Sequence, residues 1–242
     1  MAKKDEKLYF KKIGAEGVDF TLGKPFSDPE NLGSLLSAMA AIFTLMPKNS
    51  VKVVDLGCGS GWTSDFYAKA GHNVTGIDIS KPAITAAIGF FKRDNLSFLC
   101  CDFDKMPFKD EFDVAIFNDS LHHTDDEKET LKSVYKILKP GGIIIICEPG
   151  VGHSKSQSSL EAMKKYSVSE RDMPPKLSIK ALKLAGFKNI KTYSHPSKIH
   201  RVSYKNFDCK KKLLNFTTSR IFTLFLFSSI MKKNHGVVTA IK

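Results

Sequence analysis

The sequence predicts an α/β protein built around a mostly parallel sheet. From residue 51 onward, short apolar runs typical of strands alternate with segments of helical spacing. A run of four isoleucines at residues 143–146 indicates a strand covered on both faces. The 242 residues, 42% of them hydrophobic and 26% charged, are enough for a sizeable core without disulfides. Collagen-like and disordered chains and disulfide-stapled miniproteins are therefore excluded.

The first quarter of the chain is expected to precede the sheet. Residues 1–27 are rich in lysine and read as an irregular or short-helical lead-in. Asp28, Pro29 and Glu30 are typical of a helix start, with a capping carboxylate, a proline at the first helical position and an acid in the first turn. Apolar residues at helical spacing follow, and Pro47 is expected to end this helix.

The alternating part of the chain follows. Strands are expected at residues 51–56, 74–78, 96–102, 112–118, 143–147, 189–193 and 237–241. Helices are expected at residues 61–70, 80–92, 125–138 and 178–185. Gly71 and Gly186 stop two of them, and residues 140–142, Pro-Gly-Gly, read as a turn. Ligands of such sheets bind outside the carboxyl ends of the strands, so those ends are the places to search for a site.

Charge and cysteine content limit the remaining classes. Of a net charge of +12, +9 lies in residues 195–242, where Asp208 is the only acid. A phosphate group, a nucleic acid or an anionic membrane surface would suit that segment. The five cysteines form no C-x-x-C pair, which argues against a disulfide framework and a zinc site, and no metal is predicted. The N-terminus lacks a signal-peptide run, and the longest apolar stretch is too short to cross a bilayer, so a cytoplasmic location is expected.

A glycine-rich turn follows the first strand, in Asp55-Leu56-Gly57-Cys58-Gly59-Ser60-Gly61. Such a turn brings the backbone against a ligand, and the next helix offers unpaired N–H groups. Trp62 stands where the dinucleotide fingerprint needs its third glycine, and no P-loop lysine follows. Asp55 would repel a phosphate and attract a cationic amine. The turn therefore favours a ligand without a phosphate.

Acids also end the next two strands. Asp78 lies 23 residues after Asp55, close to the spacing at which an acid meets a ribose. Asp102 and Phe103 can accept a hydrogen bond from an exocyclic amine and stack on a base. The three ends together indicate a ligand with an amine, a ribose and an adenine. S-adenosyl-L-methionine (SAM) fits this description.

The motifs VVDLGCGSGWTSDFYAKAG, VTGIDIS, CCDFDKMPF, FDVAIFNDSLHH and LKPGGIIIICEPG resemble, in order, those of class I SAM-dependent methyltransferases. The resemblance covers residues 51–150. It implies a Rossmann-like fold, a mostly parallel seven-stranded sheet with helices on both faces, and a helical insertion before the last strand. The flanks KPFSDPE and EPGVGHSKS resemble a bacterial subgroup associated with surface-polysaccharide pathways.

The same resemblance implies roles for individual residues. The glycines would hold the methionine part of SAM, Asp55 its ammonium, Asp78 the ribose, Asp102 and Phe103 the adenine, and Asn118 the region near the sulfonium. The predicted cofactor-binding residues are Asp55, Gly57, Cys58, Gly59, Gly61, Asp78, Ile79, Asp102, Phe103 and Asn118. The product would be S-adenosyl-L-homocysteine (SAH).

Methyl transfer needs a base where the acceptor starts neutral, and histidine titrates near physiological pH. The candidates are His122 and His123 after the fourth strand, and Glu148 and His153 after the fifth. Asp119 is a candidate to orient a histidine or to bind the acceptor. No N-P-P-Y motif, no catalytic Pro-Cys and no paired-Glu loop is visible. An oxygen or nitrogen of a small metabolite or sugar, nucleotide- or lipid-linked acceptors included, is therefore the predicted acceptor.

Four parts of the chain are expected: an N-terminal cap and first helix (residues 1–47), a SAM-binding core (48–194), a basic and apolar insertion (195–235) and a final core strand (236–242). The insertion has three interpretations: a packed subdomain or dimer contact, a lid over the acceptor, or a membrane-binding segment. The N-terminal residues, with Tyr9 and Phe10, are candidates to fold over the cofactor. A monomer or homodimer is expected.

Two rival functions remain open. One is an RNA methyltransferase that grips phosphates with Lys210, Lys211 and Lys212; the missing motifs argue against nucleic acid without excluding it. The other is a SAM-binding regulatory protein without turnover. Cofactor binding alone would not separate them, because all three functions share the same SAM site.

Overall fold

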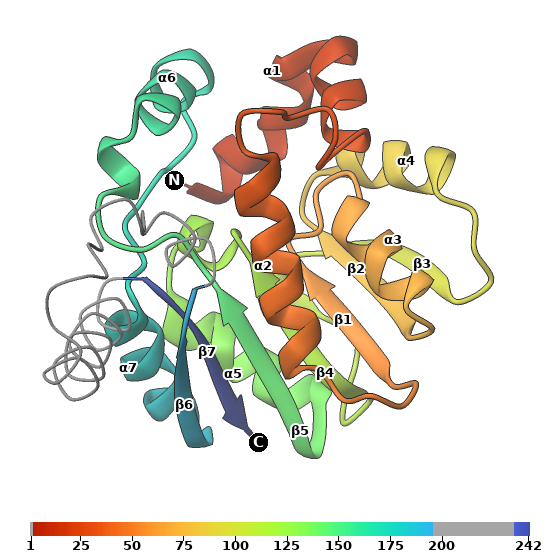
Figure 1. Ribbon diagram of the computed structural model, residues 1–242, viewed down its shortest axis with the longest axis vertical. Coiled ribbons are helices and arrows are strands. Elements are labelled where there is room, and N and C mark those ends of the chain that lie inside the picture. The colour runs from red at the N-terminus through yellow and green to blue at the C-terminus, as the bar shows by residue number, and fades with distance from the viewer. Residues whose placement is uncertain (1, 196–234) are drawn as a thin grey trace, which may run out of the picture.

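The computed structural model describes residues 2–195 and 235–242. Within these residues, seven strands form one sheet in the order β3-β2-β1-β4-β5-β7-β6. The strands run through the middle of the molecule with helices on both sides (Figure 1). This arrangement confirms the predicted α/β class and the mostly parallel seven-stranded sheet.

Five strands are parallel to one another. They are β1 (Lys52–Leu56), β2 (Asn73–Asp78), β3 (Leu96–Cys100), β4 (Phe112–Asn118) and β5 (Leu138–Cys147). The predicted turn at residues 140–142 lies inside β5, as a bulge where the register with β4 shifts. Extra residues are accommodated in this way without ending a strand. The carboxyl ends of the parallel strands therefore share one edge of the sheet.

The last two strands complete the sheet from the other direction. The final strand, β7 (Gly236–Ile241), lies antiparallel between β5 and β6 (Lys188–Ser194). Ser194 pairs with Gly236, and Val237 pairs with Cys147 at the end of β5. The chain therefore leaves β6 and returns into β7 at the edge where β5 ends.

Two hydrophobic layers hold the helices to the sheet because alternate strand residues point to opposite faces. On one face, Val54, Ile144 and their neighbours pack against α5 (Glu127–Ile137) and α7 (Pro175–Ala185). On the other face, Val53, Ile145 and their neighbours pack against α2 (Leu32–Leu45) and α3 (Trp62–Lys69). Both faces of the central strands are covered, as the isoleucine run predicts. The helix α4 (Lys81–Phe90) packs beside β2 and β3.

The N-terminal lead-in is more ordered than predicted. Residues Ala2–Leu22 form α1, which has a non-helical kink at Gly14. It lies at the top of the view in Figure 1, near α4 and α6 (Gln157–Tyr166). Tyr9 meets Tyr166 edge-to-face at 5.3 Å between ring centroids. These aromatic contacts with a distant helix stabilise a segment in which local spacing alone gave no clear helix.

The next helix begins later than predicted. Asn31 is the residue before α2, and Asp28 accepts hydrogen bonds from the backbone and side-chain amides of Asn31. Pro29 therefore lies in the turn before the helix and not at its first position. The carboxylate caps the turn that leads into the helix, which explains why the sequence pattern looked like a helix start.

The basic segment cannot be compared with its prediction. The described residues stop at 195 and resume at 235, so the expected insertion and Lys210–212 lie outside them. The proposed boundaries at residues 47, 194 and 235 stay predictions. Among the described residues, no helix is long and apolar enough to cross a membrane.

Candidate active site

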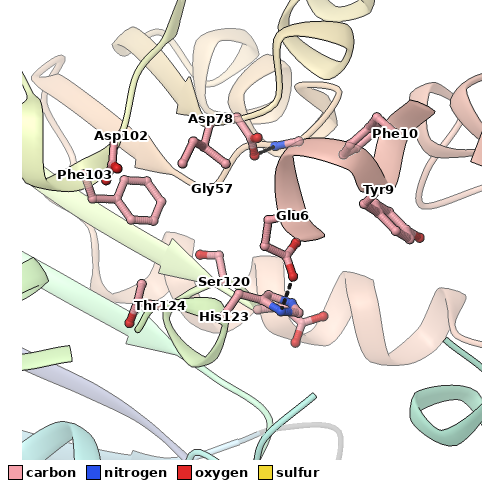
Figure 2. Close-up of a pocket in the computed structure, with 13 residues that line it drawn as sticks. Glu6, Tyr9, Phe10, Gly57, Asp78, Asp102, Phe103, Ser120, His123 and Thr124 are labelled. Atoms are coloured by element: carbon pink, nitrogen blue, oxygen red, sulfur yellow. Dashed lines mark hydrogen bonds and ion pairs between the residues drawn. The ribbon is translucent and has the colours of Figure 1, made fainter. Parts of the chain in front are cut away.

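A pocket lies at the carboxyl ends of the parallel strands, beneath α1 (Figure 2). It contains about 760 Å³ of space, part of it open to solvent. Its walls come from the strand ends, the loops that follow them and the first half of α1. The lining residues are Glu6, Tyr9, Phe10, Gly57, Gly59, Asp78, Ile79, Asp102, Phe103, Asp119, Ser120, His123 and Thr124.

The turn after β1 presents backbone to the pocket. Gly57 and Gly59 line it with φ angles of 76° and 54°, which favour glycine. A Cβ on Gly57 would lie 2.4 Å from the Cβ of Ser120, and one on Gly59 would lie 3.3 Å from the Phe10 ring. A side chain at either position would fill the space between the turn and the facing wall. Because the two glycines have no side chain, a ligand can approach the backbone of the turn closely.

Asp78 places a carboxylate at the end of β2. Its Oδ2 accepts from the Gly59 N–H at 2.9 Å and its Oδ1 from the Ser80 N–H at 2.8 Å. Burial raises the pKa of Asp78 to about 6, and these two hydrogen bonds lower it in part. Each carboxylate oxygen has a second acceptor position. Asp78 is therefore able to accept hydrogen bonds from a pair of ligand hydroxyls while the turn holds it in place.

Asp102 and Phe103 form the wall beyond β3, and the Phe103 ring faces the open space in Figure 2. The Asp102 carboxylate accepts from the Asp104 N–H at 3.1 Å and caps a short 3₁₀ turn. The Phe103 ring packs edge-to-face on Phe117, with centroids 5.6 Å apart. An acid and a fixed aromatic ring at this place suit a planar base with an exocyclic amine.

Glu148 orders the loop after β4. Its Oε1 accepts from the N–H groups of Ser120 and Leu121 at 3.0 and 2.8 Å. Its Oε2 accepts from the N–H of His122 and lies 2.7 Å from His122 Nδ1. Burial alone would lower the pKa of His122, but Glu148 and Glu170 raise it to about 10. His122 is fully buried and does not line the pocket.

His123 is the histidine that faces the pocket (Figure 2). Its Nδ1 lies 2.8 Å from the carbonyl oxygen of Ser169 and 3.2 Å from Glu6 Oε1. Because a carbonyl only accepts, Nδ1 carries the proton, and Nε2 holds the lone pair of the neutral ring. Burial lowers the pKa of His123, and the Glu6 carboxylate raises it. The second effect outweighs the first, so the pKa of His123 lies above its ordinary value.

His153 lies beside this pair, outside the pocket lining. Its Nε2 is 2.7 Å from Glu170 Oε2, and its ring meets His122 edge-to-face with centroids 5.1 Å apart. Arg171 donates to the carbonyl oxygens of His122 and Thr124 at 2.8 and 2.6 Å. The segment at residues 170–171 thus ties the histidines to the loop after β4.

The comparisons with known proteins agree with this geometry. A family model described as a methyltransferase domain matches residues 54–146, which run from β1 to β5 and carry the glycine-rich turn. Residues 54–146 thus form a methyltransferase domain of the class I SAM-dependent family. This is a family of enzymes, and SAM is its cofactor.

Individual relatives are methyltransferases as well. The chain is 28% identical over 54% of its length to a malonyl-[acyl-carrier protein] O-methyltransferase of Salmonella typhimurium, and 32% over 46% to a demethylmenaquinone methyltransferase of Streptomyces griseus. The matched parts are 53% and 47% of those proteins, so the chain spans about half the length of these curated relatives.

A solved methyltransferase of Haloferax volcanii, in complex with the Trm112 methyltransferase activator, covers 96% of both chains. Its TM-score is 0.64 at 22% identity, a likeness of fold.

The pocket brings together several of the residues that the sequence predicts to bind the cofactor. Of the predicted cofactor-binding residues, the pocket includes Gly57, Gly59, Asp78, Ile79, Asp102 and Phe103. The space kept by Gly59 and the hydroxyl-accepting carboxylate of Asp78 suit the methionine part and the ribose. Cys58, Gly61 and Asn118 are outside the pocket lining.

Asp55 has a different setting from the one predicted. Its Oδ2 accepts from the hydroxyls of Thr63 and Ser64, both at 2.6 Å, and only 1% of Asp55 is exposed. Burial raises its pKa to about 6. These contacts fasten the start of α3 behind the turn. Contact between Asp55 and the cofactor's ammonium stays a prediction that this placement does not support.

The structure adds residues that the predicted set omitted. Tyr9 and Phe10 line the pocket, as expected for a segment that folds over the cofactor, but Glu6 was not foreseen. Asp119, a candidate to orient a histidine or to bind the acceptor, lines the pocket with a φ of 58°, which is rare outside glycine. Glu170, which joins His122 and His153, had no recognisable motif. These residues become visible only when the loops are brought together.

Proposed function

We propose that this protein transfers a methyl group from SAM to an oxygen or nitrogen of a small metabolite or sugar. The observation that carries the proposal is the position of His123, which lines the same pocket as Gly57 and Asp78. A proton acceptor thus shares one cavity with the residues that suit the cofactor. The proposal covers the whole reaction, since the family assignment fixes the cofactor but not the acceptor.

SAM supplies a methyl group already activated on a sulfonium. The protein's own contribution is to hold the acceptor in line and to take its proton. Gly57, Gly59 and Asp78 would fix the cofactor, and Phe103 the adenine. Ser169 holds His123 so that Nε2 is the nitrogen able to accept the proton. Glu148 is a positioning residue, because its carboxylate is fully used by the loop after β4.

Sugars are included among the acceptors because of two features of the chain. The segment EPGVGHSKS, which resembles the polysaccharide-associated subgroup, contains Glu148 and His153 and forms part of the wall around the histidines. Polar side chains, Asp119, Ser120 and Thr124, line the pocket beside His123. Hydroxyl and carboxylate groups of this kind suit an acceptor with several hydroxyls. The residues behind the RNA and membrane hypotheses lie outside the described part of the chain, so no contact favours those functions.

Two measurements test the proposal. Calorimetry should show SAM and SAH binding that Asp78→Ala abolishes and that Asp94→Ala, an exposed substitution, leaves unchanged. SAH release should then be followed with panels of sugars, amines and nucleotide-linked sugars. His123→Gln should lower turnover by about 10²–10⁴-fold without weakening SAH binding. His72→Gln should leave turnover unchanged, because His72 is a buried histidine at the opposite end of β2 from Asp78. Failure of the folded wild type to bind SAH would overturn the proposal.

A further inference from the structure

His122 has one ring nitrogen without a hydrogen bond. Its Nδ1 is held by Glu148, and its Nε2 is buried and has no hydrogen-bond partner among the described residues. The nearest charged atom recorded for Nε2 is Glu170 Oε2, at 3.4 Å, and the side chain of His122 is 0% exposed. The Glu170 carboxylate compensates part of the desolvation of this nitrogen, but a buried nitrogen without a well-formed hydrogen bond is uncommon.

Two further ligand-type side chains lie around this nitrogen. One ligand atom each from Asp119, His122 and His153 lie within 4.8 Å of one another. Neighbouring ligand atoms around a bound transition metal are roughly 3.0–3.5 Å apart, since metal–ligand bonds are about 2.1 Å. The three groups would need to close by up to about 1.3–1.8 Å. Asp119 is exposed, so its side chain is the least confined of the three.

Both histidines have the hydrogen bond that usually supports a metal-binding histidine. A metal-binding histidine generally donates its second ring nitrogen to a carboxylate or carbonyl, which fixes the ring. Glu148 holds Nδ1 of His122 at 2.7 Å, and Glu170 holds Nε2 of His153 at 2.7 Å. This leaves Nε2 of His122 and Nδ1 of His153 as the nitrogens that would coordinate an ion, and at His122 the ion would replace the ring's second proton.

We propose that Asp119, His122 and His153 bind a divalent first-row transition metal ion. Two imidazoles and one carboxylate are a known set for such ions, with coordination positions left open. Because Asp119 lines the pocket, those positions would open toward it. Mg²⁺ is expected to bind far more weakly, since it prefers oxygen ligands.

A second overlapping set is less suited. His122, His123 and Glu170 also have ligand atoms within 4.8 Å. There, however, Glu170 is already the partner of His153, and His123 shares its Nδ1 between Ser169 and Glu6. Asp119 adopts a left-handed backbone, with φ of 58°, and such conformations outside glycine gather at functional sites. The set with Asp119 is therefore the one to test.

The test uses full-length, tag-free protein stripped with EDTA. Titration with Zn²⁺ followed by calorimetry should give one ion per chain, and Co²⁺ should produce visible absorption bands. Asp119→Asn keeps a residue that tolerates a left-handed backbone, and it should bind Zn²⁺ at least about 10-fold more weakly. Asp110→Asn is the matched control, because Asp110 also has a positive φ, 47°, and should bind like the wild type.

His153→Gln is a second variant, chosen because His153 is partly exposed and less central to the fold than His122. It should lose the Co²⁺ bands. No Zn²⁺ uptake by the wild type, or equal affinity in Asp119→Asn and Asp110→Asn, would overturn the inference. SAH calorimetry on the same stripped samples keeps the questions separate: SAH binding without metal binding rejects the metal site and leaves the proposed methyl transfer standing.

Discussion

One carboxylate oxygen of Glu148 accepts both the backbone N–H and the ring Nδ1–H of His122, at 3.2 and 2.7 Å. The other oxygen accepts the N–H groups of Ser120 and Leu121. A single side chain at the end of β5 therefore shapes the loop that follows β4. The neighbouring strand ends are coupled through this buried contact, and the position of His123 depends on it.

The first prediction concerns this contact. Glu148→Ala should lower the free energy of unfolding by about 3–5 kcal/mol, because it leaves buried donors unpaired. Glu148→Gln, which keeps one acceptor oxygen, should cost less. Urea unfolding followed by circular dichroism measures both. Glu161→Ala, on the exposed side of α6, should change stability by no more than about 0.5 kcal/mol. A similarly small loss for Glu148→Ala would contradict this account of the loop.

Cofactor binding should depend on pH through Asp78. Its pKa is about 6 in the folded protein, raised mainly by burial, and the ionised carboxylate is the better acceptor for ribose hydroxyls. SAH affinity should therefore fall as pH decreases through 6, by about tenfold between pH 7 and pH 5. Calorimetry over this range measures the effect. Asp78→Asn should bind more weakly with a flat profile; the same slope in that variant would assign the pH dependence to another group.

Gly59→Ala should weaken SAH binding at least tenfold, because its Cβ would enter the space facing Phe10. It would also strain a backbone with φ of 54°. Gly71→Ala is a control for the strain alone: Gly71 has φ of 93°, and a Cβ there meets nothing within 4 Å. Gly71→Ala should be less stable yet bind SAH normally. Equal binding losses in the two variants would show that strain, not occupied space, is the cause.

Asp55 should make the protein less stable as pH rises. Its pKa is about 6, above the ordinary value of 3.8. Between these values the folded state holds more protons than the unfolded state, so the free energy of unfolding falls as pH increases from about 4 to 6. The contribution is up to about 3 kcal/mol. Asp55→Asn should remove it and still accept from Thr63 or Ser64. Urea unfolding at several pH values tests this, with the exposed Asp94→Asn as control; an unchanged slope in Asp55→Asn would refute it.

The sheet and the pocket residues at the strand ends could be predicted, because both follow from patterns within short stretches of the chain. A strand and the residue that ends it are adjacent in the chain, so Asp78 and Phe103 could be placed at the same edge from topology alone. The surroundings of Asp55 could not be predicted, for a physical reason. The hydroxyls of Thr63 and Ser64 come from the following helix, and they turn the carboxylate away from the pocket. The sequence alone does not show whether a carboxylate accepts from hydroxyls of the next helix or from a ligand.

The histidine cluster depends on contacts that span long stretches of chain. Glu170 meets His153 from 17 residues away, and Glu148 meets His122 across 26. The spacing of the cysteines bears only on a metal site made of thiolates. It gives no information about a site made of imidazole and carboxylate groups from separate loops. The order of α1 has a similar origin, since it depends on contacts with α6.

The pairing of Ser194 with Gly236 has a consequence for which part of the sequence can vary. The 41 residues between them begin and end on two adjacent hydrogen-bonded strands. Their length and composition can therefore change without altering the register of the sheet or the glycine-rich turn. Both anchors lie at the edge of the sheet where β5 ends. The architecture thus offers a position where one segment can be exchanged for another while the sheet and the glycine-rich turn stay constant.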